Sequence, residues 1–257
     1  MDAAAGEAVL NPFPPMKKVL AILLVALFAG CAAKDGLFDA GAKFAEAEKY
    51  MRKDDFEKAR KAYQEIQEKA PDKSYDADIM LRIADTYFGE EKYDEALVEY
   101  QAFLNFHPVH RNAAYAQFQI AMCSFKQLPT IDRDPDIVRT SLREFEKLIK
   151  KYPDSLYADR ASRNIATCRE HLSQYELYVA EFYYKKGSYQ AALGRIENML
   201  KDYPDSLAEK DALYYAGLAY REMGDRSRAM AVLDRLAKKY PSMQEKAESV
   251  IRSLKGK

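Results

Sequence analysis

The side chains of this 257-residue chain best suited to nucleophilic or metal-binding chemistry are three cysteines and three histidines. His107 and His110 lie close together, but no third ligand follows at a spacing suited to a metal ion. The sequence has no C-x-x-C, no H-E-x-x-H, no G-x-S-x-G and no glycine-rich phosphate loop. We therefore expect no catalytic residue, no metal site and no cofactor, and the protein is predicted not to be an enzyme.

Cys31 differs from the other cysteines because of what precedes it. The basic segment Met16–Lys18 and the apolar run Val19–Phe28 are typical of a signal peptide. The apolar run is too short to span a bilayer, which takes ~20 residues. Residues 1–30 are therefore predicted to be a signal peptide, with residues 1–15 upstream of the true start.

The segment Leu27-Phe28-Ala29-Gly30-Cys31 resembles the lipobox of bacterial lipoproteins, although Phe28 stands where leucine is usual. The resemblance implies that the Cys31 thiol is acylated and that the chain is cut before it. Residues 31–42 are then a lipidated tether, which holds the protein on the periplasmic face of the outer membrane. Ala32 is not the aspartate of the inner-membrane retention signal. The alternative is an ordinary signal peptide with an incidental cysteine.

Cys123 and Cys168 lie at apolar-facing positions of predicted helices, where a free cysteine behaves as a small hydrophobic residue. Whether they form a disulfide in an oxidising compartment is left undecided, because the sequence does not give the pairing geometry.

One repeated frame organises the rest of the chain. Each copy has a small anchor residue, large apolar residues four and seven positions later, and a proline twelve positions later. The first three share one face of a helix, and the proline ends that helix. The five copies are Ala59/Tyr63/Ile66/Pro71, Ala96/Tyr100/Phe103/Pro108, Ser141/Phe145/Leu148/Pro153, Ala192/Ile196/Met199/Pro204 and Ala229/Leu233/Leu236/Pro241.

A partner helix precedes four of these copies, with a small residue twelve positions before the anchor and a tyrosine three positions after that. These pairs are Ala47/Tyr50, Ala84/Tyr87, Ala180/Tyr183 and Gly217/Tyr220. Helix pairs with a period of about 34 residues resemble the tetratricopeptide repeat. The resemblance implies an all-α solenoid of five helix pairs, built from contacts between neighbours. A formal net charge of zero gives no electrostatic case for nucleic acid.

The third repeat contains an insertion. Its anchor Ser141 lies twenty positions after Ala121 (141 − 121), against twelve in the other repeats, so eight residues are added around Leu128–Pro135. We expect a proline-bounded loop. Its charged residues Asp132, Arg133 and Asp134 are candidates for a partner contact. The alternative is a solvated loop in which Asp134 caps the next helix.

A long helix follows, because residues 155–186 contain neither glycine nor proline and their apolar residues recur at helical spacing. This central helix is predicted to begin near Ser155. It would join an N-terminal repeat module (43–154, repeats one to three) to a C-terminal module (155–257, the long helix and repeats four and five).

Several segments resemble the BamD family of lipoproteins, subunits of the outer-membrane β-barrel assembly (BAM) complex. The resemblance covers essentially the whole chain after Cys31. The inserted loop is shorter than in the enteric members, which leaves its contacts open. The segments are Asp132–Pro135, Phe145 with Leu148, Lys151–Ser155 with Tyr157, Tyr175–Tyr183 and Arg195–Pro204.

The resemblance implies partners. The C-terminal repeats are expected to bind the periplasmic POTRA domain of BamA nearest the barrel, with Arg195 at or near the contact; the alternative is a solvent-facing helix arginine. Other BAM lipoproteins are expected to join. The N-terminal repeats are expected to receive the C-terminal strand signal of unfolded outer-membrane β-barrel proteins.

A concave groove of stacked helix pairs suits an extended peptide, and Tyr50, Tyr87 and Phe88 are its candidate aromatic contacts. The function predicted is a lipid-anchored scaffold that binds rather than catalyses. Two alternatives remain: another periplasmic repeat lipoprotein that coordinates cell-envelope or division machinery, and a soluble cytosolic co-chaperone in which Cys31 carries no lipid.

Overall fold

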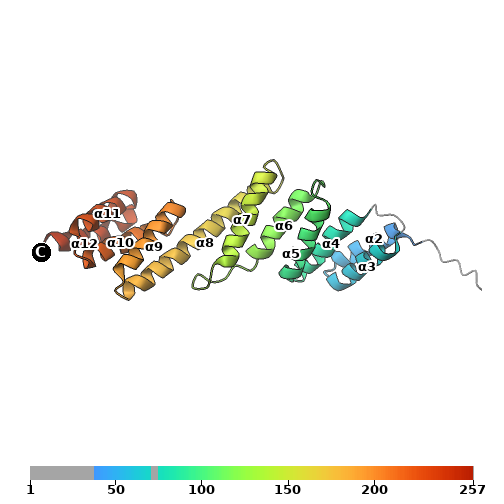
Figure 1. The fold of residues 1–257 in the computed structure, drawn as a ribbon, viewed down its shortest axis with the longest axis horizontal. Helices are drawn as coiled ribbons and strands as arrows, with labels where there is room; N and C mark the ends of the chain where they lie inside the picture. Colours follow the sequence, from blue (N-terminus) through green and yellow to red (C-terminus); the bar gives the residue numbers. More distant parts are fainter. Residues whose placement is uncertain (1–37, 71–74, 257) are drawn as a thin grey trace, which may run out of the picture. The chain divides into compact units, whose positions relative to one another are not determined.

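The computed structural model describes residues 38–70 and 75–256 of the chain. Within these ranges the structure consists of helices and loops and has no strand (Figure 1), so the all-α prediction is confirmed. The elements are α2 (Ala40–Met51), α3 (Phe56–Lys69), α4 (Asp76–Gly89), α5 (Tyr93–Phe106), α6 (Ala113–Phe125), α7 (Asp136–Lys151), α8 (Ala158–Lys185), α9 (Tyr189–Asp202), α10 (Glu209–Glu222), α11 (Arg226–Lys239), a short 3₁₀ helix η1 (Pro241–Met243) and α12 (Gln244–Lys255).

The helices pack as consecutive neighbours, as a tetratricopeptide-repeat solenoid requires. The five pairs are α2/α3, α4/α5, α6/α7, the second half of α8 with α9, and α10/α11. Residues Gly41–Lys257 form one compact unit, and Met1–Ala40 are assigned to another, almost all of which lies outside the described residues. Helix α2 begins at Ala40, inside the stretch 31–42 that was expected to be a tether.

The anchor frame explains this packing. All five anchors are fully buried, and each second helix ends two residues before its proline, as expected from the restriction that proline places on the residue before it. Two repeats show how closely the two helices of a pair approach each other. The Ser141 hydroxyl donates to the carbonyl of Ala121 at 3.3 Å. A Cβ on Gly217 would lie 2.6 Å from Leu233, so only glycine fits there without a shift.

The turn inside four of the repeats has one geometry. A residue with positive φ stands five positions before each anchor, and the next backbone N–H donates to the carbonyl of the repeat tyrosine. This left-handed ending satisfies carbonyls that the helix end leaves without partners. The positive-φ residues are Asp54, Glu91, Gly187 and Gly224, and the accepting tyrosines are Tyr50, Tyr87, Tyr183 and Tyr220.

The predicted long helix is present as α8, 28 residues long. It begins at Ala158 rather than near Ser155, because the backbone from Tyr152 to Ala158 makes two consecutive turns before the helix starts. Its first half packs against α7 around Cys168 and Leu172. Its second half packs against α9 and α10 around Ala180. Helix α8 therefore takes part in the packing of both predicted modules, and the boundary between them stays a prediction.

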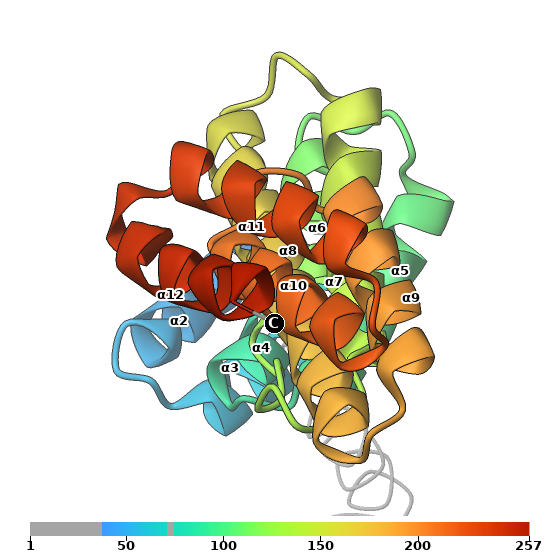
Figure 2. The same ribbon diagram turned by 90° about the vertical axis from the view of Figure 1, so that its left-hand side faces the viewer.

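The C-terminal end of the stack is covered by α12. Its apolar face, centred on Val250, Ile251 and Leu254, packs on α11 and α10. Figure 2 shows α12 beside α11 at this end. The last helix thus buries the apolar surface that a sixth repeat would otherwise cover, as expected of a capping helix.

Candidate functional site

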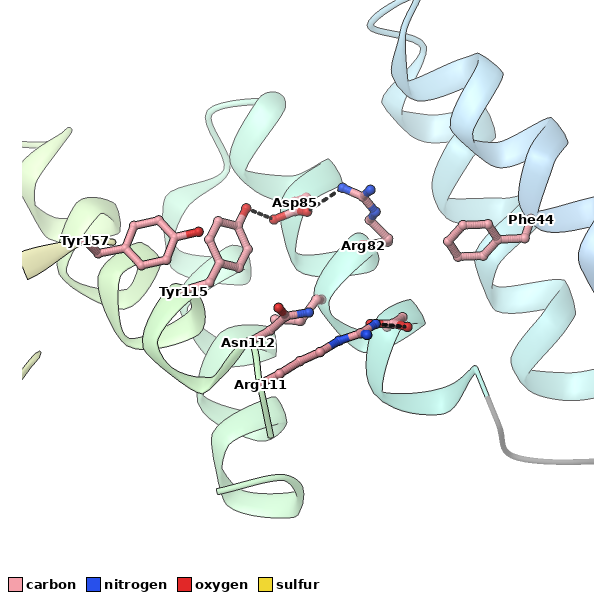
Figure 3. A pocket seen from close by; sticks show the side chains of 9 residues that line it. Phe44, Arg82, Asp85, Arg111, Asn112, Tyr115 and Tyr157 are labelled. Carbon is pink, nitrogen blue, oxygen red and sulfur yellow. Dashed lines mark hydrogen bonds and ion pairs between the residues drawn. The ribbon is translucent and has the colours of Figure 1, made fainter. Parts of the chain in front are cut away.

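A pocket of about 460 Å³ lies among the first helices of the first three repeats and the entry to α8. We call it the front pocket. Figure 3 shows Tyr157, Tyr115, Asp85, Arg82 and Phe44 across it, with Asn112 and Arg111 along one side. Its lining residues are Phe44 of α2, Asp78, Leu81, Arg82 and Asp85 of α4, Arg111 and Asn112 just before α6, Tyr115 of α6, and Tyr157 just before α8.

Asp85 is the centre of the hydrogen bonds beneath this pocket. The hydroxyls of Tyr100 and Tyr115 both donate to its Oδ1, at 2.6 and 2.5 Å. The amide of Gln119 donates in turn to both hydroxyls, at 3.2 and 3.3 Å. The Asp85 side chain is only 12% exposed, so these bonds replace the water that it loses.

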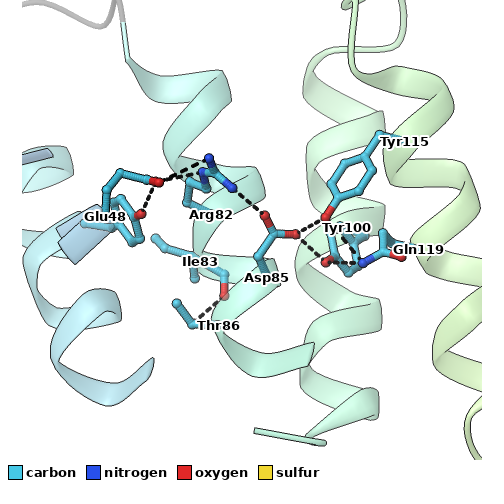
Figure 4. Close-up of polar contacts among 9 residues, drawn as sticks. Glu48, Arg82, Ile83, Asp85, Thr86, Tyr100, Tyr115 and Gln119 are labelled. Carbon is cyan, nitrogen blue, oxygen red and sulfur yellow. Dashed lines mark hydrogen bonds and ion pairs between the residues drawn. The ribbon is translucent and has the colours of Figure 1, made fainter. Parts of the chain in front are cut away.

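Arg82 joins this network to the first repeat (Figure 4). Its Nη1 lies 3.3 Å from Asp85, and its Nε lies 2.9 Å from Glu48 of α2. The hydroxyl of Tyr63 in α3 also donates to Glu48, at 2.5 Å. A chain of polar contacts therefore runs through helices of three repeats and fixes the direction in which Arg82 points.

Burial dominates the electrostatics of this cluster. Loss of water raises the pKa of Asp85 above its ordinary value, against the hydrogen bonds and Arg82, which lower it. Loss of water and then the Asp85 charge raise the pKa values of Tyr100 and Tyr115. Both tyrosines therefore stay neutral donors at physiological pH. The pocket wall presents guanidinium and amide hydrogen-bond donors together with aromatic rings, a combination that suits the binding of a ligand.

The three residues predicted for the client groove, Tyr50, Tyr87 and Phe88, do not line the front pocket. The Tyr87 ring lies under the guanidinium of Arg60, 4.1 Å away, and the Phe88 ring packs on Tyr93. Tyr50 donates to Glu46, one turn earlier on its own helix. At these repeat positions the rings pack on their own helix or on the second helix of a repeat.

The inserted loop is ordered by contacts within the chain. The Thr130 hydroxyl donates to Asp132 at 2.6 Å, and Asp134 accepts the backbone N–H of Asp136, the first residue of α7, at 2.9 Å. The N-cap residue of α7 is Pro135, so Asp134 holds the chain one position before the cap. The carbonyl of Pro129 lies 2.8 Å from Nε2 of His171 on α8. Asp132, Arg133 and Asp134 are all exposed, so a partner contact there stays a prediction.

Arg195 lies on α9 and is 42% exposed at its side chain. Its Nη1 donates to Glu176 of α8 at 3.0 Å, and Arg139 of α7 lies 3.9 Å from the other oxygen of the same carboxylate. Arg195 is therefore neither buried nor free in solvent. It is half-exposed and pairs with the carboxylate of Glu176.

Cys31 lies outside the described residues, as do all of residues 1–30. Cys123 and Cys168 are both free and buried, in two different apolar clusters. The rings of His107 and His110 pack on Phe103. In the described ranges, no three His, Cys, Asp or Glu side chains gather as metal ligands would, and no helix is long and apolar enough to cross a membrane.

Sequence reasoning missed the residues of the front pocket, yet a signal for them exists. Counted from the small residue of each first helix, Phe44 and Leu81 stand three positions earlier, and Asp78 and Tyr115 stand six positions earlier. These positions recur because they face the same side of consecutive repeats. Comparing these positions between repeats would have identified four of the nine lining residues.

The repeat frame, the turns and the stacked pairs define a tetratricopeptide-repeat solenoid with a peptide-sized pocket on its first three repeats. The family model described as the outer membrane lipoprotein YfiO matches residues 39–236, and the chain belongs to this family.

Named relatives agree with this membership. The chain is 26% identical over 229 residues to the outer membrane protein assembly factor BamD of Neisseria meningitidis serogroup A, covering 81% of this chain and 86% of the relative. It is 27% identical over 233 residues to BamD of Rickettsia prowazekii, covering 88% and 93%. Among solved structures, the TPR2AB domain of yeast Sti1 aligns at 13% identity with a TM-score of 0.44, covering 79% of this chain and 78% of that one.

Proposed function

We propose that this protein is an outer-membrane protein assembly factor, a scaffold of the BAM complex that works by binding. The observation that carries the proposal is its similarity to assembly factors called BamD across most of both chains. Membership of the outer membrane lipoprotein family supports an anchor at Cys31 on the periplasmic face of that membrane. An acyl anchor would raise the local concentration of the scaffold beside BamA and the other BAM lipoproteins.

The client site that we propose is the front pocket, and client contacts of Tyr50, Tyr87 and Phe88 outside it stay a prediction. An unfolded outer-membrane β-barrel protein offers an extended segment with exposed backbone and aromatic side chains. The pocket lies open between repeats and combines the rings of Phe44, Tyr115 and Tyr157 with hydrogen-bond donors, the combination that such a segment needs.

The second binding surface that we propose is on the C-terminal repeats, where Arg195 meets a carboxylate on the POTRA domain of BamA. Arg195 uses one nitrogen for Glu176 and has further donors in its planar fork. A half-exposed arginine already held by one carboxylate loses little side-chain freedom when a second one binds. The exposed loop residues Asp132, Arg133 and Asp134 are a further contact surface for the BAM partners.

The test is binding of the chain Ala32–Lys257 to the periplasmic region of BamA from the same organism. We expect an affinity in the micromolar range or tighter, and a loss of at least about tenfold for Arg195→Glu, because reversing a charge at a contact costs a close ion pair. Arg143→Glu is the matched control, since Arg143 is an exposed arginine of α7 whose Nη2 donates to Thr140 on the same helix. Glu176→Gln, which frees Arg195, should retain binding.

The outcomes separate the parts of the proposal. Unchanged binding of Arg195→Glu would keep the assembly role and exclude Arg195 from the contact. No binding by the wild-type chain would contradict the assembly role and favour the coordinator of cell-envelope or division machinery. The lipid is tested separately: the full-length chain should incorporate labelled palmitate, and Cys31→Ala should not.

A further inference from the structure

The two arginines of the front pocket are held very differently. Arg82 makes contacts with two carboxylates, Glu48 and Asp85, at 2.9 and 3.3 Å. Those carboxylates are 24% and 12% exposed, and tyrosine hydroxyls hold both in place. Drawing Arg82 toward a ligand would leave two shielded carboxylates without their cation, which is costly.

Among the residues that the structure describes, Arg111 pairs with one carboxylate, and this pair is easily separated. Its Nη2 lies 3.4 Å from Asp78, and the two side chains are 76% and 37% exposed. Water screens an ion pair of this kind, and such pairs contribute little to stability. Figure 3 shows Arg111 reaching along the side of the pocket, with Asn112 next to it. A ligand anion that replaces or shares Asp78 therefore meets little resistance.

The other residues of the pocket limit the kind of ligand that carries this anion. The ring centroids of Tyr115 and Tyr157 lie 5.7 Å apart, and Tyr157 also stacks on Phe118 at 5.2 Å, so rigid aromatic rings line the same pocket as Arg111. The Tyr115 hydroxyl is already committed to Asp85. The wall thus offers ring contacts, a guanidinium and a side-chain amide within one pocket.

The charge of the pocket lining limits the number of carboxylates that a ligand can bring into it. The lining contains two arginines, Arg82 and Arg111, and two aspartates, Asp78 and Asp85, so its formal charge is zero. One carboxylate that binds Arg111 in place of Asp78 is paired with that cation, and the displaced Asp78, 37% exposed, is left to water. A second would face Asp78 or Asp85 without a cation of its own, and like charges at close range repel.

We propose that Arg111, and not Arg82, is the residue of the front pocket that recognises a carboxylate, and that the ligand is an extended peptide with one carboxylate beside an aromatic ring. The proposal rests on the client role proposed above and specifies what that site reads. The carboxylate belongs either to the chain terminus or to an acidic side chain next to the ring.

The experiment measures binding of fluorescein-labelled hexapeptides to the chain Ala32–Lys257 by anisotropy. Three peptides share a sequence that ends in phenylalanine: the free acid, the C-terminal amide, and the amide with aspartate before the phenylalanine. For the peptide that carries the recognised carboxylate, Arg111→Gln should weaken binding about 10- to 100-fold, the range of a charge-assisted hydrogen bond. The same substitution should leave the plain amide unchanged.

Two further variants serve as internal controls. Asp78→Asn removes the internal competitor and should tighten binding of the carboxylate peptide a few-fold. Arg143→Gln, at an exposed arginine of α7, should leave all three affinities unchanged. Circular dichroism before each titration confirms that the variants are folded.

The outcomes are distinguishable. Tight binding of the free acid alone assigns the terminal carboxylate, and tight binding of the aspartate peptide assigns a side chain; both support the proposal. Equal affinity for all three peptides, or no effect of Arg111→Gln, overturns it while leaving the pocket a client site. If wild-type protein binds none of the peptides and no urea-unfolded outer-membrane β-barrel protein, the client role falls together with the proposal.

Discussion

Arg60 shows how a charged side chain becomes part of the packing between the first two repeats. Its Nη1 donates to the hydroxyl of Thr86 at 3.1 Å, and its Nη2 donates to both oxygens of Glu90 at 3.1 Å. Its guanidinium covers the ring of Tyr87 at 4.1 Å. The ring of Tyr87, a candidate for ligand contact in the sequence, therefore packs against the guanidinium of Arg60 within the chain.

Arg60→Ala is expected to lower the free energy of unfolding by about 2–4 kcal/mol, because it leaves the partly buried carboxylate of Glu90 without this partner. Lys92 remains near Glu90 and limits the loss. Lys58→Ala, which removes an exposed cation of the same helix, should leave the free energy of unfolding nearly unchanged. Urea unfolding followed by circular dichroism measures both, and equal effects would contradict the packing role of Arg60.

Asp85 gives a prediction about pH. Because burial raises its pKa in the folded chain, the folded state keeps this proton to higher pH than the unfolded chain does. The ordinary pKa of an aspartate is 3.8. The contribution of Asp85 to the free energy of unfolding is therefore full below that pH and is lost as the pH rises through the pKa of the folded state. The wild type should lose stability relative to Asp85→Asn as the pH rises through that window.

The comparison with Asp85→Asn is needed because other carboxylates act in the opposite direction. Glu90 and Glu209 have lowered pKa values, so their contributions are lost as the pH falls, equally in both proteins. An asparagine at 85 still accepts from Tyr100 and Tyr115, which keeps the variant foldable. A difference between the two proteins that stays constant from pH 3 to 7 would show that Asp85 does not titrate in this way.

At the scale of single elements, the turn between the two helices of a repeat depends on one residue with positive φ. Gly187 has φ +76°, and a Cβ there would meet no atom within 4 Å. Gly194, inside α9, also has open space around it but lies in an ordinary helix. The two sites differ in backbone conformation and not in crowding, so they form a matched pair.

Gly187→Ala should lower the free energy of unfolding by about 1 kcal/mol, since an L side chain is strained in the left-handed region. Gly194→Ala should raise it by up to about 1 kcal/mol, because alanine favours the helix. Thermal or urea unfolding of the two variants distinguishes these signs. Changes of the same sign at both positions would show that backbone conformation is not what decides them.

The elements were largely predictable from the sequence, and the reason is local. A small anchor, its apolar partners and a following proline lie within one helix, so their spacing alone predicts the pairs, their buried faces and their ends. The start of α8 was misplaced because the turns between Tyr152 and Ala158 resemble a helix N-terminus in sequence. The front pocket was not predicted because its wall comes from helices of different repeats. Asp85 and Tyr115, thirty positions apart, meet only after stacking.

At the scale of the whole molecule, each described core cluster involves only neighbouring helices. Cys123 belongs to the cluster of α4, α5 and α6, whereas Cys168 packs with α7 and α8. Their separation into two clusters agrees with both thiols being free. Burial raises the pKa of Cys123 to about 12 and also raises that of Cys168, so neither forms a reactive thiolate while the chain stays folded.

The labelling rates of the two thiols can test whether each repeat is stabilised mainly by its neighbours. Ending the chain at Tyr240 removes α12 and uncovers the apolar cluster that contains Leu233 and Leu236. If stability passes from neighbour to neighbour, this loss should weaken the nearby repeats most. Maleimide labelling should then become faster at Cys168 than at Cys123, relative to the chain Ala32–Lys257.

Mass spectrometry of the two labelled peptides measures each rate without replacing either cysteine. In the longer chain both thiols should be protected, and denaturant should release two equivalents. Equal acceleration at both sites in the shortened chain would mean that Gly41–Lys257 opens as a single cooperative unit, because the loss at the C-terminal end would then reach the first three repeats undiminished. Acceleration confined to Cys168 would mean that the N-terminal repeats, with the front pocket, keep their structure when the C-terminal repeats loosen.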